Sequence, residues 1–167
     1  RQMCIRDSYF GVKERADEKS PDEIDEQNEV IIAGFGHFGS TIGRLLRANG
    51  VQATILDNDS DRVESLRKMG FKVYYGDATR LEMLKAAGAE NAKLFIAAID
   101  NPVSNLTVID SVNKHFPELT ILTRARNRID AYEFIDKGIN NVYRETLYSA
   151  VHLGVDALVH LGHRKYS

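Results

Sequence analysis

Three glycines follow a short apolar run at G-x-G-x-x-G spacing: Gly34, Gly36 and Gly39. Gly34 permits a sharp turn, Gly36 lets a phosphate approach the backbone because it has no Cβ, and Gly39 lets the next helix pack closely. The start of that helix offers unpaired N–H groups and a partial positive charge. The spacing therefore predicts a binding site for a pyrophosphate.

An acidic residue lies where the ribose of such a ligand would follow. The apolar run 51–56 ends in Asp57, 18 residues after the last glycine of the motif, and a carboxylate there can accept hydrogen bonds from ribose hydroxyls. Asp57 would repel a 2′-phosphate and the nearest arginine, Arg62, lies a turn into the next helix, so NAD is favoured over NADP. The alternative is a helix cap, which Asp59 or Ser60 can also provide.

A strand and a helix must hold the glycine motif, and this unit repeats along the chain. β-branched and apolar runs predict strands at Val30–Ala33, Ala53–Leu56, Lys72–Tyr75, Leu94–Ala98, Thr120–Thr123 and Asn141–Tyr143. Amphipathic segments predict helices at about Phe38–Ala48, Ser60–Met69, Arg80–Ala87, Pro102–His115, Arg128–Lys137 and Leu147–Leu161. Left-handed caps are expected after four of them, at Gly50, Gly70, Gly88 and Gly138. The alternation predicts a single α/β domain with a doubly wound, parallel, Rossmann-like sheet in three layers.

Ligands of such a sheet bind beyond the carboxyl ends of its strands. The expected strand ends are Gly34–Gly36, Asp57, Gly76–Asp77, Asp100–Asn101, Arg124–Arg126 and Arg144–Glu145. Asp77 can accept a hydrogen bond from an adenine amino group while Ala78 leaves room for the ring; the alternative is a cap with Thr79. Ala98 and Ile99 would pass close to the diphosphate if the fourth strand pairs with the first.

Two arginines end the fifth predicted strand. Arg124 and Arg126 are i, i+2 neighbours, so they point the same way on a strand. They could bind an anion; the alternative is that one of them pairs with Asp100 or Asp57.

The last predicted helix has one apolar face at i, i+3/i+4 spacing, made of Leu147, Val151, Gly154, Val155, Leu158 and Leu161. This face packs either on the sheet or on a partner surface, for which a second copy of the chain is the simplest candidate.

Composition excludes several classes of function. The 167 residues are 43% hydrophobic and 28% charged, which is ordinary for a globular domain, and no apolar run is long enough for a membrane span. The net charge of −2 lacks the excess of basic residues that is typical of nucleic-acid-binding domains. The single cysteine, Cys4, excludes an internal disulfide and a cysteine-based zinc site, and no histidine spacing predicts a metal.

The charge is unevenly distributed. Residues 1–29 hold nine acidic and five basic side chains. Residues 1–8 fit no pattern in the rest of the chain, and we interpret them as a non-native remnant. Residues 9–28 are interpreted as an acidic linker to an upstream part, with a disordered tail as the alternative; 29–145 form the domain, and 146–167 the C-terminal helix, a candidate dimer contact.

The runs VIIAGFGHFG, ILDNDSDRVESLRKMGFKVYYGDATR, AAIDNP, HFPEL, RARNR and YRET resemble the nucleotide-binding RCK domain of the TrkA-N type. Among its members, the chain is most similar to the cytoplasmic domain of Kef-type glutathione-gated potassium/proton antiporters. The resemblance begins at about Tyr9 and extends to the C-terminus.

The resemblance implies a homodimeric regulatory domain that binds NAD(H) or AMP at the cytoplasmic face of the cell membrane. The membrane antiporter domain would lie upstream in the same polypeptide, and glutathione and an ancillary flavoprotein are the further partners it implies. The residues assigned to the nucleotide are Gly34, Phe35, Gly36, His37, Phe38, Gly39, Asp57, Asn58, Asp77, Ala78, Thr79, Ala98, Ile99, Asp100 and Arg124. His37, Arg124 and Arg126 are assigned to the regulatory ligand. The family often has Arg where this chain has His37, so an anion contact there would be lost or pH-dependent.

Two other functions share the fold. A soluble regulatory subunit of a Trk-type potassium uptake system would be a separate polypeptide. An NAD-dependent oxidoreductase would need an acid–base pair, but the sequence after residue 28 has no Tyr-x-x-x-Lys motif and no second domain for a substrate. We therefore expect a domain that is not an enzyme.

Overall fold

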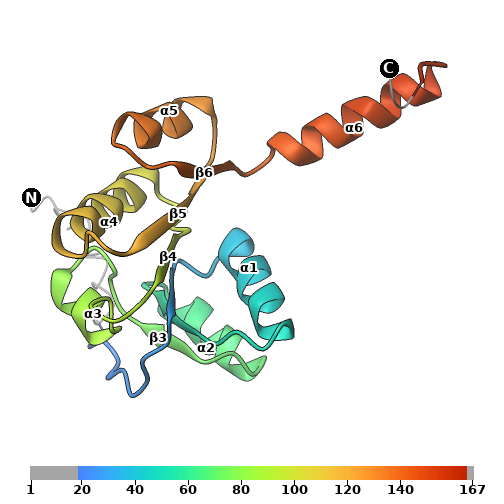
Figure 1. Cartoon of the computed structure of the whole chain (residues 1–167). Helices are drawn as coiled ribbons and strands as arrows, with labels where there is room; N and C mark the ends of the chain where they lie inside the picture. Colours follow the sequence, from blue (N-terminus) through green and yellow to red (C-terminus); the bar gives the residue numbers. More distant parts are fainter. Residues whose placement is uncertain (1–18, 165–167) are drawn as a thin grey trace, which may run out of the picture.

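The computed structural model describes residues 19–164, so residues 1–8 and the first part of the acidic segment lie outside the described residues. Strands and helices alternate without exception (Figure 1): β1 Val30–Ala33, α1 His37–Ala48, β2 Ala53–Asp57, α2 Ser60–Lys68, β3 Val73–Tyr75, α3 Leu81–Ala86, β4 Leu94–Ala97, α4 Pro102–His115, β5 Thr120–Ala125, α5 Arg128–Asp136, β6 Asn141–Arg144 and α6 Leu147–His160. The six strands form one parallel sheet in the order β3-β2-β1-β4-β5-β6. The predicted doubly wound fold is confirmed.

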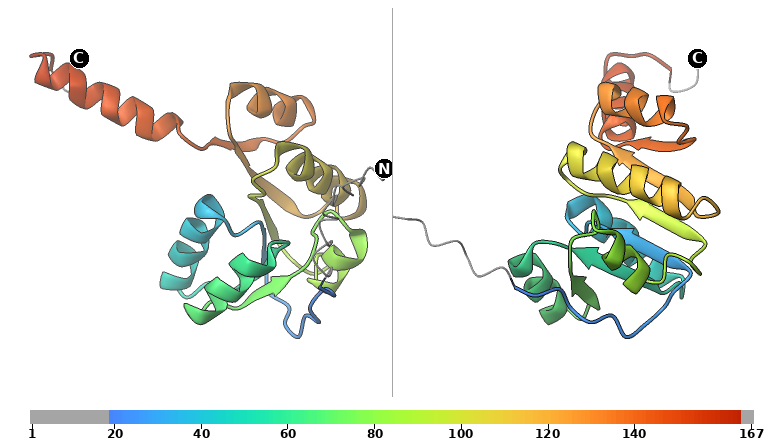
Figure 2. Two further views of the ribbon diagram at one scale, coloured as in Figure 1. Left: turned by 180° about the vertical axis from the view of Figure 1, so that it is seen from behind. Right: turned by 90° about the vertical axis from the view of Figure 1, so that its left-hand side faces the viewer.

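Buried side chains on the two faces of the sheet produce three layers. Along β1, Ile31 and Ala33 belong to a core shared with α3, α4 and α5, whereas Val30 and Ile32 belong to a core shared with α1 and α2. Figure 2 shows these two groups of helices on opposite sides of the sheet. Alternate residues of a strand face opposite ways, so an uninterrupted apolar run is what a strand covered on both faces requires.

The predicted elements agree with the structure within two residues at each end. All four glycines expected to cap helices have positive φ. One difference affects the site. The strand predicted to end at Thr123 continues to Ala125 in β5, because Arg124 and Ala125 still pair with β6. Arg124 therefore lies buried inside a strand, whereas Arg126 is exposed in the bend beyond it, so the strand alternation that predicted a common direction does not extend to Arg126.

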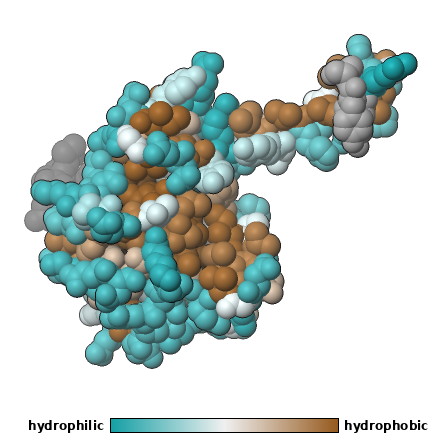
Figure 3. Space-filling view, viewed as in Figure 1, coloured by the Kyte–Doolittle hydropathy of each residue, from teal (hydrophilic) through white to brown (hydrophobic). Residues whose placement is uncertain are grey.

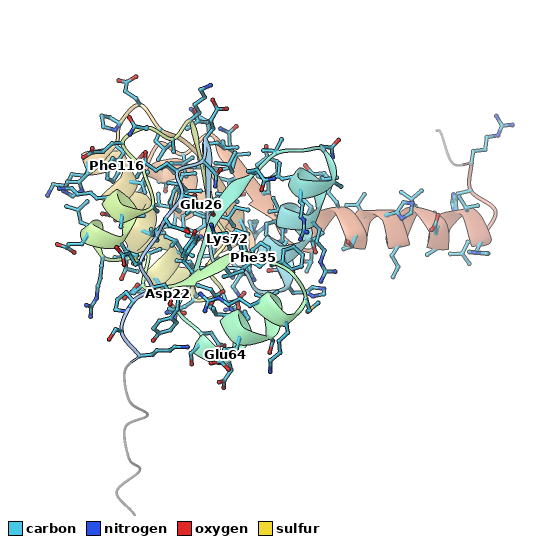
Figure 4. The ribbon with its side chains drawn as sticks, turned by 90° about the horizontal axis from the view of Figure 1, so that it is seen from below. Asp22, Glu26, Phe35, Glu64, Lys72 and Phe116 are labelled. Carbon is cyan, nitrogen blue, oxygen red and sulfur yellow. The ribbon has the colours of Figure 1, made fainter. Side chains whose placement is uncertain are left out.

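Residues 19–28, hereafter the strap, run along the edge strand β3 in an extended conformation. From Asp22 to Asn28 every second side chain is partly buried, and the Asp22 backbone N–H donates to the Tyr75 carbonyl at 2.8 Å. Figure 4 shows Asp22 and Glu26 on the strap, and Lys72 near Glu26. The Lys72 ammonium is 3.3 Å from the Glu26 carboxylate. The Tyr74 hydroxyl and the Lys72 ammonium lower the pKa of Asp25. This end of the predicted linker thus covers an open sheet edge, although a groove of about 660 Å³ remains beside it.

The helix α6 extends away from the sheet (Figure 1), and none of its residues is buried. Packing of its apolar face on the sheet, one of the two alternatives, is therefore wrong: β6 ends at the sheet edge and the chain continues outward. Figure 3 shows apolar atoms along α6 and on the part of the domain nearest to it. Leu45 of α1 is 66% exposed. Within residues 19–164, no helix has both the length and the apolarity needed to cross a bilayer.

Candidate functional site

The glycine loop forms a tight turn between β1 and α1. Gly34 has φ of 89°, and its N–H donates to the Leu56 carbonyl at 2.8 Å. A methyl group added at Gly39 would lie 2.0 Å from the Gly34 carbonyl oxygen, so this glycine lets α1 begin directly on the loop. Gly36 is the N-cap of α1, and no side chain caps this end of the helix. The first N–H groups of α1 thus remain available to an anion, as the spacing predicted.

Asp57 closes one side of the loop from the end of β2. Its side chain is buried, and its carboxylate accepts hydrogen bonds from the Phe35 N–H at 2.7 Å and the Asp59 N–H at 2.9 Å. The cap of α2 is Asp59, which accepts from the Arg62 N–H at 3.0 Å. The capping alternative for Asp57 is therefore wrong, and its carboxylate instead stabilises the loop that would receive the ligand.

Arg62 was not among the predicted site residues, yet its guanidinium lies beside Asp57, the residue predicted to bind the ribose. It is 3.1 Å from Asp57, 3.4 Å from Asp59 and 3.6 Å from Asp100. Burial acts to lower the pKa of Arg62, but the charge and hydrogen bond of Asp57, with the other carboxylates, raise it above its ordinary value. Although Arg62 lies a turn into α2, as the sequence indicated, its guanidinium reaches Asp57 because its long side chain folds back towards β2.

Asp77 and its neighbours form the next side of the cleft, at the end of β3. The Asp77 carboxylate accepts from the Thr79 N–H at 2.9 Å and from the Thr79 hydroxyl at 2.7 Å. These hydrogen bonds close the turn before α3, but that helix has Arg80 as its N-cap and no side-chain cap, so the helix-cap alternative for Asp77 is wrong. Ala78 is buried beneath the turn. The side chain of Asp77 remains 42% exposed, so it can still accept a hydrogen bond from an adenine.

Arg124 is buried at the end of β5 between two carboxylates. It lies 2.5 Å from Asp100 and 2.6 Å from Glu145, and its guanidinium is 5.6 Å from the centre of the Phe38 ring. The predicted pairing with Asp100 is thus present. Since Glu145 comes directly before Thr146 and α6, Arg124 connects the glycine-loop region to the base of that helix.

Asn105 holds the loop after β4 in place. It was not among the site residues predicted from the sequence. This buried residue of α4 accepts from the Ile99 N–H at 3.1 Å and donates to the Thr123 hydroxyl at 3.0 Å. It therefore joins the ends of β4 and β5 beneath Asp100. An asparagine inside an otherwise apolar helix face was the available signal.

The strand ends enclose a cleft of about 180 Å³. Eight of the predicted nucleotide residues line it: Gly34, Asp57, Asn58, Asp77, Ala78, Thr79, Ile99 and Asp100. Six more lining residues were not assigned to the nucleotide: Leu56, Asp59, Arg62, Gly76, Asn101 and Ser104. The other predicted residues lie around the cleft: Gly36, His37, Phe38 and Gly39 at the start of α1, and Phe35, Ala98 and Arg124 buried behind it. His37 and Arg126 are exposed.

Comparison with known proteins agrees with this geometry. A family model described as the TrkA-N domain matches residues 30–145. This chain belongs to the TrkA-N family. The match covers the glycine loop, the cleft and all six strands of the sheet.

Solved structures resemble this TrkA-N domain over most of its length. A Kef CTD from Shewanella denitrificans, in AMP-bound form, is 42% identical, with a TM-score of 0.74 and coverage of 84% of each chain. The TrkA-N domain of the inner membrane protein ybaL from Escherichia coli is 25% identical, with a TM-score of 0.69, covering 78% of this chain and 96% of that one. The GsuK channel bound to NAD is 20% identical, with a TM-score of 0.70, covering 87% of this chain and 26% of that one, which shows the fold alone.

Proposed function

We propose that this TrkA-N domain binds NAD(H) or AMP and thereby regulates a potassium/proton antiporter of the Kef type. The observation that carries the proposal is that the buried Asp57 and the Asp77 turn line one cleft together with Gly34, which belongs to the loop that leads into the uncapped start of α1. These groups suit a ribose, an adenine and a phosphate in that order. The 42% identity to a Kef CTD in AMP-bound form supports the same ligand class.

The proposed role is regulatory and not catalytic. Within the described residues, the cleft is lined by glycines, small and apolar residues, carboxylates, amides, hydroxyls and one arginine, without a histidine, tyrosine, lysine or cysteine. Such a lining can bind a nucleotide, and its only groups that could act as a general base are carboxylates, of which Asp57 is held by the Phe35 N–H and by Arg62. Ligand binding would instead favour one arrangement of the domain over another.

The strap and the acidic segment before it would connect this domain to an upstream membrane part. We place the domain at the cytoplasmic face of the cell membrane, where the nucleotide is available. The strap supports this arrangement, since Asp22 contacts both β3 and Arg67 of α2 and could transmit a shift of the domain to preceding residues. Glutathione and an ancillary flavoprotein are further proposed partners, and the exposed His37 and Arg126 are the proposed glutathione contacts.

Calorimetric titration of the whole chain with NADH, AMP and NADPH tests the proposal. Saturable binding of NADH or AMP is expected, without any change in NADH absorbance over a panel of small carbonyl substrates. Glutathione added to the nucleotide-loaded protein should then give a further heat signal. An absence of nucleotide binding would refute the proposal, and turnover of NADH would show that the domain is an oxidoreductase.

The helix α6 is the proposed dimer contact. An isolated helix of 14 residues is marginal in water, so one with exposed Val151, Leu153 and Leu158 needs a partner surface. We propose that a second copy covers the apolar stripe containing Val151 and Leu158.

Val151→Asp should therefore weaken dimerisation, because it would bury an unpaired charge in the proposed interface. We expect the dimer dissociation constant to rise about tenfold or more, as measured by sedimentation equilibrium. Ser149→Asp places the same charge on the opposite side of α6 and is expected to leave the constant unchanged. A monomeric parent chain, or equal effects of the two variants, would contradict the proposed interface.

A further inference from the structure

An acidic side chain lies at the position that the glycine loop keeps open. A methyl group added at Gly36 would be 3.0 Å from Oδ2 of Asp100. Gly36 is the residue whose missing Cβ allows a phosphate to approach the start of α1. In this structure it is the carboxylate of Asp100 that makes this approach.

Both neighbouring arginines are directed to the same carboxylate. Oδ1 of Asp100 is 2.5 Å from Nη1 of Arg124, and Oδ2 is 3.6 Å from Nη2 of Arg62. Arg62 comes from α2 and Arg124 from β5, so Asp100 connects the two halves of the sheet across the glycine loop. Two guanidinium groups and a helix N-terminus around one anion form the environment that a phosphate would require.

The difference in burial decides which group would move. The side chain of Asp100 is 55% exposed, whereas that of Arg124 is 7% exposed and is also held by Glu145 through Nε at 3.1 Å and Nη2 at 2.6 Å. Asp100 can therefore turn into solvent, while Arg124 remains anchored with Nη1 facing the loop. The backbone on either side of Asp100 is fixed by Asn105, which accepts from the Ile99 N–H, and by Asn101, which caps α4.

We propose that Asp100 is an internal anion that occupies the phosphate position of the glycine loop and is displaced by the phosphate of an incoming nucleotide. The phosphate of a ligand must therefore compete with the Asp100 carboxylate for the guanidinium groups of Arg62 and Arg124. This competition lowers the affinity for phosphate-bearing ligands. This inference rests on the proposed nucleotide site. Its distinctive consequence is that removing the negative charge of Asp100 strengthens binding.

The test compares Asp100→Asn with the parent chain by calorimetric titration with AMP and with adenosine. Asparagine keeps the shape of the side chain but removes the like charge beside the phosphate, so the dissociation constant for AMP should fall about tenfold at low salt. The gain should shrink at high salt, because screening weakens the repulsion that the parent exerts. Adenosine has no phosphate, so its affinity should be the same for both proteins.

Asp110→Asn is the matched control, since it also removes one carboxylate, from an ion pair with Lys137 outside the cleft. Its affinity for AMP should equal that of the parent. Asp100→Ser serves as the second variant if the asparagine variant fails to fold, with the same expected gain.

Three results would overturn the inference: equal or weaker AMP binding by the Asp100 variants, an equal gain for adenosine, or an equal gain in Asp110→Asn. If neither AMP nor NADH binds to the parent or to any variant, the proposed nucleotide site fails and the inference fails with it. Equal binding by the parent and the Asp100 variants would leave the nucleotide site intact and remove only the role of Asp100.

Discussion

Asp57→Asn is expected to lower both the stability of this TrkA-N domain and its affinity for NADH and AMP. The buried carboxylate accepts from the N–H groups of Phe35 and Asp59 and pairs with Arg62. An asparagine there would point its NH2 group at one of these backbone N–H groups, which is a contact between two donors. The positive charge of Arg62 would also lose its partner. The free energy of unfolding should fall by about 3 kcal/mol, the scale for breaking a buried charged pair.

The loss of nucleotide affinity should be about 1–3 kcal/mol, because a ribose would lose hydrogen bonds to a charged acceptor. Urea denaturation and calorimetric titration measure the two effects separately. Asp59→Asn is the matched control: Asp59 is half-exposed, and asparagine caps a helix as well as aspartate does. If the two variants had the same stability, the loop would not depend on the Asp57 carboxylate. If Asp57→Asn bound NADH normally, the ribose assignment would be wrong.

Gly39→Ala should destabilise the domain by about 3 kcal/mol, at the upper end of the usual cost of overpacking. The added methyl group would lie 2.0 Å from the carbonyl oxygen of Gly34, which is a backbone atom and cannot change rotamer. Either α1 moves away from the loop or the turn at Gly34 opens. The melting temperature measured by circular dichroism should fall by roughly 6–12 °C for a chain of this size.

Gly154→Ala provides the comparison for Gly39→Ala. Gly154 lies in α6 with no heavy atom within 4 Å of an added methyl group, and alanine favours a helix by about 1 kcal/mol. Because Gly154 lies on the apolar face proposed to contact a second copy, both variants are compared at a protein concentration below the dimer dissociation constant, where Gly154→Ala should show no decrease in melting temperature. An equally small effect of Gly39→Ala would mean that α1 can shift on the sheet at little cost, and that the close start of the helix on the loop is not required.

Much of the fold was predictable because local spacing determines it. The apolar run at β1 requires a strand covered on both faces, and the glycines after α1, α2 and α5 mark helix ends through their positive φ. Pairing of β4 with β1, on which the closeness of Ala98 to the diphosphate depended, is confirmed. Three of the expected cleft residues, Gly34, Asp57 and Asp77, lie together because parallel strands end at one edge of the sheet.

The sequence by itself determined the alternation of strands and helices, the glycine loop and the identity of the acidic residues around it. Only the tertiary structure decided that Arg62 folds back over Asp57, that Asp100 lies against Gly36, and that α6 leaves the sheet. The physical reason is the range of the interactions. Strand and helix patterns depend on neighbours a few residues away, whereas the direction of a long charged side chain depends on partners from other elements, brought close only when the sheet forms.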